Sequence, residues 1–69
     1  MERLNTVTAY GATGERHTFE AYAKTTGAPY IVMLDGAFLA TCESGAEIGE
    51  EIEDTIRWFN WQRTCPIFA

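Results

Sequence analysis

The sequence is short of positive charge and has no long apolar run. Five lysines and arginines stand against ten aspartates and glutamates, which gives a formal net charge of −5. Nucleic acids and anionic lipids recruit basic patches, so this composition argues against direct binding to either. The longest apolar run, residues 30–34, is far shorter than the roughly 20 residues that cross a bilayer. We therefore expect no membrane insertion and no direct contact with nucleic acid, and we expect a partner with a basic surface.

Cysteine is also scarce, and the spacing of the two cysteines opposes a disulfide. Cys42 and Cys65 flank a predicted helix of about 19 residues, which at 1.5 Å per residue would hold them roughly 28 Å apart. Bridged Cα atoms lie within about 7 Å of each other. We expect two reduced thiols, with Cys42 as a small core residue. The sequence also begins without the charged and then apolar pattern of a signal peptide, so we predict a soluble, cytoplasmic protein.

Motifs for catalysis and metal binding are missing as well. The single histidine, His17, has no cysteine or second histidine at ligand spacing. A Gly-x-Ser-x-Gly elbow, a Cys–His signature and a phosphate-binding glycine loop do not occur, and Gly-Ala-Thr-Gly at residues 11–14 indicates a turn. We predict a protein that is not an enzyme, with no catalytic residue, no metal ligand and no cofactor.

The segments that the sequence does contain indicate a small antiparallel sheet. Its 69 residues suffice for one domain, and no repeat or linker divides them. Residues 4–10, rich in threonine and valine, predict a strand. Residues 30–34 predict another, whose continuous apolarity indicates burial on at least one face. Asp35-Gly36 is a strong hairpin signal because a type I′ turn needs positive φ at both positions, so residues 37–42 predict the return strand.

Residues 16–23 allow two interpretations. Apolar and polar residues alternate along this segment, which favours a strand that pairs with residues 4–10. Thr18 could instead cap a short helix of good helix formers that stops at Gly27. The predicted sheet therefore has three to four strands.

A C-terminal amphipathic helix is expected to follow the sheet. Ser44 and Glu47 form a capping box, in which each side chain accepts the other's backbone N–H, so the helix begins at about residue 45. Pro66 ends the helix or marks its aftermath. The predicted fold is α+β, a small antiparallel sheet with one C-terminal helix packed on it. Apolar residues at i, i+4, i+8 and i+11 form the stripe that would lie across the sheet, namely Ile48, Ile52, Ile56 and Phe59.

The same helix concentrates negative charge. Six of the ten carboxylates lie in residues 43–54, with no basic residue among them, and two tryptophans follow. Helical spacing places most of these side chains along one side, about a quarter to a half turn from the isoleucines. We expect Trp58 to close one end of the core, whereas Trp61 points away from the isoleucines and could form an exposed anchor. The predicted partner-binding residues are Glu47, Glu50, Glu51, Glu53, Asp54, Trp58 and Trp61.

A solvated helix face is the alternative explanation of these acids. Carboxylates near the amino end of a helix complement its macrodipole, which accounts for Glu47. The acids of residues 50–54 extend past the first turn and repel one another, with only Arg57 placed to offset them. A functional acidic surface explains that arrangement, so the sequence leaves both interpretations open.

In size, acidity and lack of a catalytic motif, the chain resembles the small proteins that phages use against bacterial defence, notably acidic anti-CRISPR proteins that mimic DNA. The resemblance rests on whole-chain character and on the acidic run of residues 43–54. It implies an inhibitor that blocks a basic nucleic-acid-binding groove of a partner such as a CRISPR effector, in the cytoplasm of a bacterial host. The alternative is a general protein interaction or homodimerisation module whose aromatic end consists of Trp58, Trp61, Ile67 and Phe68.

Overall fold

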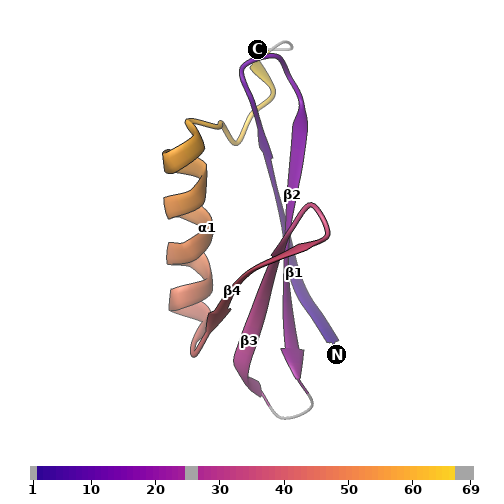
Figure 1. Cartoon of the computed structure of the whole chain (residues 1–69), viewed down its shortest axis with the longest axis vertical. Helices are drawn as coiled ribbons and strands as arrows, with labels where there is room; N and C mark the ends of the chain where they lie inside the picture. Colours follow the sequence, from indigo (N-terminus) through magenta and orange to yellow (C-terminus); the bar gives the residue numbers. More distant parts are fainter. Residues whose placement is uncertain (1, 25–26, 67–69) are drawn as a thin grey trace.

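Four strands and one helix make up the described part of the chain. The structure, a computed structural model, describes residues 2–24 and 27–66. Ile67 and Phe68, assigned above to the aromatic end, lie outside the described residues. In chain order the elements are β1 (Glu2–Tyr10), β2 (Arg16–Lys24), β3 (Gly27–Leu34), β4 (Ala37–Cys42) and α1 (Gly45–Phe59) (Figure 1).

The strands form one antiparallel sheet in which each strand pairs with its neighbour in the sequence. Their order is β1-β2-β3-β4. Residues 16–23 therefore belong to a strand, as their alternation favours, and not to a helix. Between β3 and β4, Asp35 and Gly36 have φ values of 50° and 84°, the positive values of a type I′ turn. The predicted α+β fold is confirmed as a four-stranded antiparallel sheet with one C-terminal helix.

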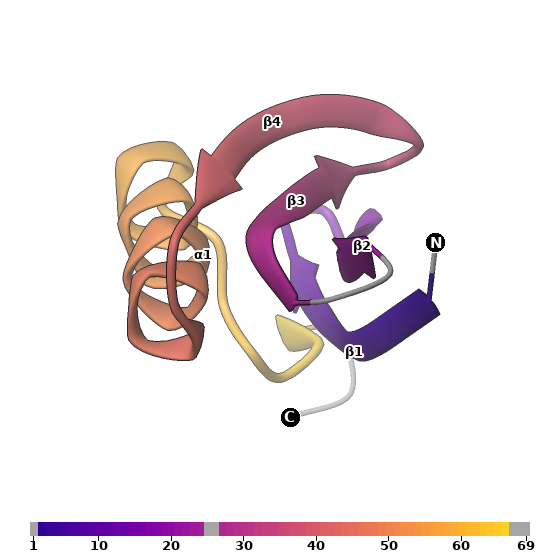
Figure 2. The same ribbon diagram turned by 90° about the horizontal axis from the view of Figure 1, so that it is seen from below.

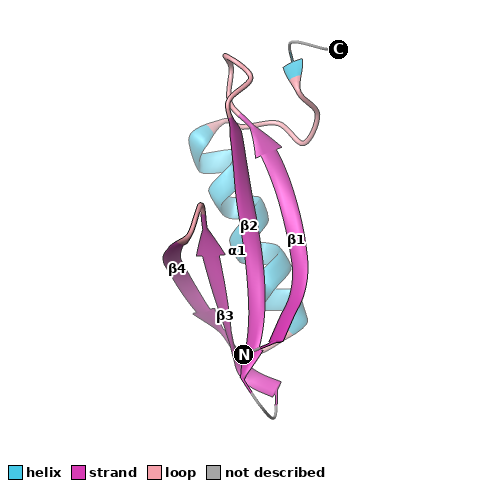
Figure 3. Cartoon of the chain, turned by 90° about the vertical axis from the view of Figure 1, so that its right-hand side faces the viewer, coloured by secondary structure: helices cyan, strands magenta, loops and turns pink. Residues whose placement is uncertain are grey.

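The helix α1 covers one face of the sheet and leaves the other face open. Figure 2 shows α1 to one side of the sheet, next to the end of β4. Figure 3 looks onto the opposite face, with α1 behind the strands. After the helix the chain returns to β1, where Tyr10 and Gln62 exchange two backbone hydrogen bonds of 2.7 and 2.8 Å. No helix in the described ranges has the length and apolar character that a membrane crossing requires.

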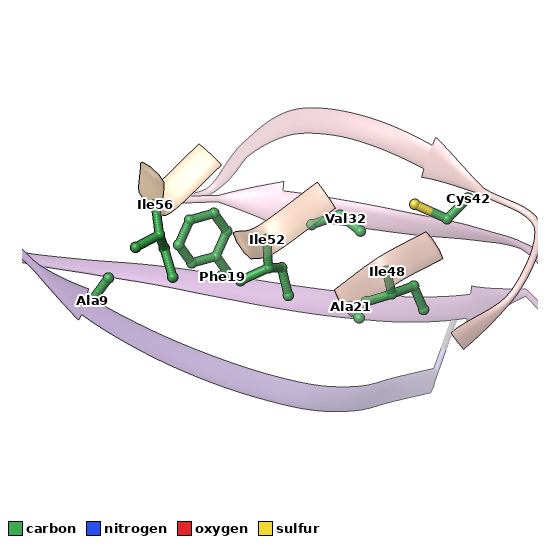
Figure 4. Packing of buried hydrophobic residues seen from close by; sticks show 8 residues of the cluster. All are labelled: Ala9, Phe19, Ala21, Val32, Cys42, Ile48, Ile52 and Ile56. Carbon is green, nitrogen blue, oxygen red and sulfur yellow. The ribbon is translucent and has the colours of Figure 1, made fainter. Parts of the chain in front are cut away.

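The core lies between α1 and the covered face of the sheet. Alternate residues of the strands point toward the helix, where the three isoleucines of α1 meet them (Figure 4). Phe19 and Val32 are the largest side chains that are fully buried. Cys42 is 2% exposed and serves as a small core residue, as expected. The buried cluster consists of Ala9, Phe19, Ala21, Val32, Cys42, Ile48, Ile52 and Ile56.

The start of α1 is capped as predicted at Ser44, whereas Glu47 bonds one residue further back than the capping box requires. Ser44 Oγ accepts a hydrogen bond from the backbone N–H of Glu47 at 3.2 Å. The Glu47 carboxylate accepts from the N–H of Glu43 at 2.9 Å, and not from that of Ser44. A glutamate side chain is long enough to pass the cap residue and reach the amide before it. The helix still begins where the box predicts, at Gly45.

The helix is shorter than predicted because Asn60 ends it. It has 15 residues instead of the expected length of about 19. Asn60 has a φ of 60°, the left-handed conformation that ends many helices, and the Trp61 N–H bonds to the Ile56 carbonyl at 2.9 Å. The sequence interpretation overlooks this stop because Trp58 and Trp61 continue the helical spacing. The chain therefore reverses well before Pro66.

Phe59 lies at the edge of the core, so its assignment to the apolar stripe is wrong. The residue is 52% exposed. The reversal at Asn60 brings Trp61 back against the sheet, and the indole takes the place beside Phe19 that Phe59 would fill. Phe59 instead stacks on that indole, with ring centroids 4.6 Å apart. The apolar stripe of α1 therefore consists of the three isoleucines alone.

Shortening the central isoleucine of α1 tests this packing. Ile52 is 3% exposed, so Ile52→Ala leaves a cavity between helix and sheet. We expect the free energy of unfolding to fall by about 2–4 kcal/mol, measured by urea denaturation followed by circular dichroism. Gly49→Ala is the matched control, because an added Cβ meets no heavy atom within 4 Å. That change should raise stability by up to about 1 kcal/mol. A negligible effect of Ile52→Ala would contradict the packing.

Candidate functional site

The carboxylates of α1 lie on the sides of the helix that its buried isoleucines do not occupy. The helix carries five carboxylates and one arginine, so it holds a formal −4 of the chain's net charge of −5. The negative charge of the molecule is therefore gathered on one element. We call this region the acidic surface, and it comprises the exposed Glu47, Glu50, Glu53 and Asp54 and the half-buried Glu51.

Two arginines offset part of this charge. Arg57 Nη1 lies 3.2 Å from Asp54 Oδ1, and both side chains are at least 70% exposed. Arg63, in the segment after the helix, pairs with Glu53. Exposed ion pairs contribute only about 0–1 kcal/mol, so a partner can replace them at little cost. The remaining carboxylates of the acidic surface form no ion pair with any residue that the structure describes, and these are Glu47, Glu50 and Glu51.

Trp58 is the more exposed of the two aromatic residues of this helix. The sequence interpretation places it in the core, but it is 83% exposed, so that prediction is wrong. Trp58 follows Asp54 by four residues and continues the row of acids along α1, while Trp61 occupies the end of the core that Trp58 is expected to close. A shallow hollow of about 380 Å³ between α1 and β4 is lined by Leu39, Asp54, Thr55, Trp58 and Phe59.

Trp61 lies off the helix and against the sheet. Its indole is parallel to the rings of His17 and Phe59, with centroid distances of 3.8 and 4.6 Å and interplanar angles of 8° and 14°. Two parallel rings this close cannot share one face of the indole, so Trp61 is sandwiched between them. Trp61 is half-buried and packs against the core. The structure thus brings six of the seven predicted binding residues together on α1 and separates Trp61 from them.

A groove runs along the side of α1 that faces β1. The helix residues there include Gly45 and Gly49, which are too small to fill the space between the two elements. The groove has a volume of about 600 Å³, and Val7, Ile48 and Ile52 supply apolar lining. It therefore joins apolar surface to part of the acidic surface. Its charged lining consists of Glu50, Glu53, Asp54, Arg57 and Arg63.

His17 belongs to a polar cluster that sequence motifs do not reveal. Its Nδ1 lies 2.8 Å from Asp35 Oδ2 in the β3–β4 turn, and its Nε2 lies 3.7 Å from Glu15 Oε2. The ring stacks on Trp61, and Nε2 is shielded from solvent without a hydrogen-bond partner. The β2–β3 register is the signal that could have revealed this contact, because it places the turn beside the start of β2. The cluster ties β2, the turn and the segment after α1 together.

Hydrogen bonds lower the pKa of both carboxyls in this cluster. Burial raises the pKa of Asp35, but the hydrogen bond with His17, the backbone N–H of Thr18 and the charge of His17 together outweigh burial. The pKa of Glu15 is lowered chiefly by the hydrogen bond from the Thr13 hydroxyl. Both carboxylates are therefore ionised at neutral pH and available to hold the imidazole.

The Cys42 thiol is buried, and the cysteines and acids of the described residues form no group that could hold a metal ion. Burial raises the pKa of the Cys42 thiol, and the charges of Glu51, Glu47 and Glu43 raise it further. A thiol with a raised pKa is largely protonated at neutral pH and is a poor nucleophile. Cys42 and Cys65 are both free, as expected. Within residues 2–24 and 27–66, no three histidine, cysteine, aspartate or glutamate side chains are grouped so as to hold a metal ion.

Comparison of the chain with models of protein families finds no match, and comparisons with curated proteins and with solved structures likewise find none. The function is therefore argued from the geometry of the described surface.

The variant Asp35→Asn tests the polar cluster, because asparagine accepts the left-handed turn but cannot ionise. The native pKa of Asp35 lies below that of the unfolded chain, about 3.9, so its charge stabilises the fold above that pH. This contribution is lost as the pH falls through the native pKa. At pH 7 we expect the variant to be less stable by about 1 kcal/mol, because the side chain is partly exposed. Urea denaturation should show the difference shrinking as the pH falls through the native pKa of Asp35, and an equal loss at acid and neutral pH would contradict the assignment.

Proposed function

We propose that the chain is a small inhibitor whose acidic surface occupies a basic, nucleic-acid-binding groove of another protein. The observation that carries the proposal is the gathering of a formal −4 on one helix. A groove that normally holds phosphates attracts such a surface over a long range and binds it quickly. A CRISPR effector in the bacterial cytoplasm is a partner with a groove of this kind.

The spacing of the charges supports mimicry of nucleic acid. From Glu47 to Asp54 the axis of α1 rises by about 10 Å. The helix carries its five carboxylates within this length, or about one per 2 Å of axis. Duplex DNA carries about one phosphate charge per 1.7 Å of its axis. A groove built for phosphates would therefore meet a similar density of negative charge over this short stretch.

The groove between α1 and β1 offers a place for a basic side chain of the partner. Lysine and arginine pack their methylene stems on apolar surface while the charged group stays at its rim. Ile48, Ile52 and Val7 provide such a surface, and Glu50 and Glu53 line the same groove. The three carboxylates of this groove stand against its two arginines, so its net charge is −1. This charge and the apolar lining favour a basic partner over an acidic one.

An exposed tryptophan in line with the acids distinguishes this proposal from a merely solvated helix face. Solvation alone requires no large aromatic ring on the outer side of α1, yet Trp58 is 83% exposed. Tryptophan is enriched among the residues that dominate binding energy at protein interfaces. The acids and the Trp58 ring would contact the same partner. The acids would supply the electrostatic attraction and fix the orientation of the partner, and the ring would add apolar contact.

Removal of four charges from α1 tests the proposal. We expect Glu47→Gln, Glu50→Gln, Glu51→Gln and Asp54→Asn together to abolish capture of partners from a bacterial lysate by the immobilised chain, because the attraction is electrostatic. Captured proteins, identified by mass spectrometry, should be nucleic-acid-binding proteins. They should elute as salt rises and be displaced by short duplex DNA, since both compete for the same groove.

A control variant that loses charge outside α1 shows whether the effect on capture is specific to the acidic surface. The control is a double variant that removes two negative charges outside α1, Glu2→Gln with Glu15→Gln. It is compared with a double variant that removes two charges from α1, Glu50→Gln with Asp54→Asn. The double variant in α1 should weaken capture of partners, whereas the control variant should not. Circular dichroism establishes that all variants fold. Capture that survives the fourfold change, or that duplex DNA fails to displace, would overturn the proposal.

A protein interaction module that docks through its aromatic side chains is the second candidate function. Its support is the hollow between α1 and β4, where Trp58 and Phe59 are 83% and 52% exposed beside Leu39. In this case the apolar contact dominates and the acids only tune specificity. Trp61, which the sequence interpretation adds to this end, lies against the core instead.

The variant Trp58→Ala separates the two functions. If the aromatic contact dominates, this change should weaken binding of a captured partner at least about tenfold, and raised salt should do little. If the acids dominate, the loss should be smaller than for the fourfold charge removal, and salt should weaken binding steeply. Titration calorimetry at low and high salt measures both effects on one purified partner.

A further inference from the structure

Strand β3 is apolar on both sides, although α1 covers only one of them. Its residues 30–34 form the longest apolar run of the chain. Val32 points into the core and is fully buried, so its neighbours Ile31 and Met33 point to the open face of the sheet. Strands with one solvated face usually alternate apolar and polar residues, whereas continuous apolarity is typical of strands covered on both faces. The sequence of β3 therefore indicates a second cover that the single chain does not provide.

The apolar residues of the open face form a continuous patch. Ile31 lies opposite Tyr22 of β2, and Met33 lies opposite Phe38 of β4. Phe38 is 63% exposed, although it is a large aromatic residue in a strand. We call this group the open-face patch, and it consists of Tyr22, Ile31, Met33 and Phe38.

The open face carries charges of both signs. Arg3 and Glu20 form an ion pair of 3.1 Å on this face, where Arg3 lies opposite Tyr22 in the register. Alternation along β2 places Arg16 and Lys24 on this face as well, so it carries three basic side chains against Glu20. In a two-fold symmetric contact each surface meets its own copy, so Glu20 of one copy can pair with a basic side chain of the other. The acidic surface lies on the other side of the sheet, so two negatively charged chains can approach through their open faces without bringing their helices together.

The open face is large enough for a weak dimer. Four strands at a spacing of about 4.8 Å and eight residues at about 3.3 Å per residue give a face of about 500 Å². Two such faces bury about 1,000 Å² in total, which is the lower limit for a specific interface. A second copy also supplies what a chain of this size rarely builds alone, since the core has few large buried residues and both cysteines are free.

We propose that a second copy of this chain covers the open face, so that two sheets pack face to face through their open-face patches. The result is a sandwich with sheets about 10 Å apart. One copy of α1 lies on each outer side. Both acidic surfaces stay free in this arrangement, so dimerisation does not depend on the proposed inhibitory function.

Sedimentation equilibrium over a series of concentrations tests this proposal. The wild-type mass should rise from 7.7 kDa toward twice that value, with a dissociation constant on the order of micromolar. Because the contact is apolar, raised salt should not dissociate the dimer. Phe38→Lys places a charge in the patch at an exposed position, so folding should persist, and we expect dimerisation to weaken at least about a hundredfold. Met33→Lys should have the same effect.

The matched control is Trp58→Lys, which replaces another exposed aromatic residue, on the opposite side of the molecule. It should dimerise like the wild type, and circular dichroism with thermal unfolding shows that each variant is folded. A wild-type chain that stays monomeric up to about 1 mM would overturn the proposal and leave the face to a different protein. A dimer that Trp58→Lys disrupts and Phe38→Lys does not would place the contact at the helix instead.

Discussion

The contact between the three isoleucines of α1 and one face of the sheet is the interaction on which the rest of the structure depends. Ile48, Ile52 and Ile56 pack above Phe19 and Val32, and the largest fully buried side chains of the described chain lie in this layer. A single helix covers only one face of a four-stranded sheet. The acids of α1 are consequently turned outward, and the opposite face of the sheet is left without a cover.

This arrangement gives the molecule two different surfaces. One consists of the outer side of α1, where carboxylates and Trp58 share the same row. The other is the open face of the sheet, where β3 adds Ile31 and Met33 to Phe38 of β4. The first surface carries a net negative charge, and the second has an apolar centre with charges of both signs. The sheet separates them, so both can be occupied at once.

Local signals predict the elements of the fold because each depends on few neighbouring residues. Asp35-Gly36 specifies a hairpin through its positive φ angles, and Ser44 specifies the helix start through one hydrogen bond. Alternation along residues 16–23 indicates the strand that the structure contains. The helix end is less visible, since Asn60 is a weaker stop signal than glycine and the tryptophans beyond it keep helical spacing.

The places of the aromatic residues depend on contacts between distant parts of the chain. Trp61 packs against the core because Asn60 reverses the chain and because the ring of His17, from another element, stacks on the indole. That stack fills the end of the core, which leaves Phe59 and Trp58 outside. Periodicity assigns a residue to a side of a helix, but it does not show which side chain from another part of the chain occupies the adjacent space in the core.

The sequence by itself determined the α+β fold, the β3–β4 turn, the start of α1 and the row of acids along it, because dihedral preference, capping and helical spacing act over a few residues. Only the tertiary structure decided that Trp58 and not Trp61 stands beside those acids, that His17 is held by Asp35, and that one side of β3 stays open. These outcomes follow from which surfaces a single short helix can reach, and that depends on the whole chain at once.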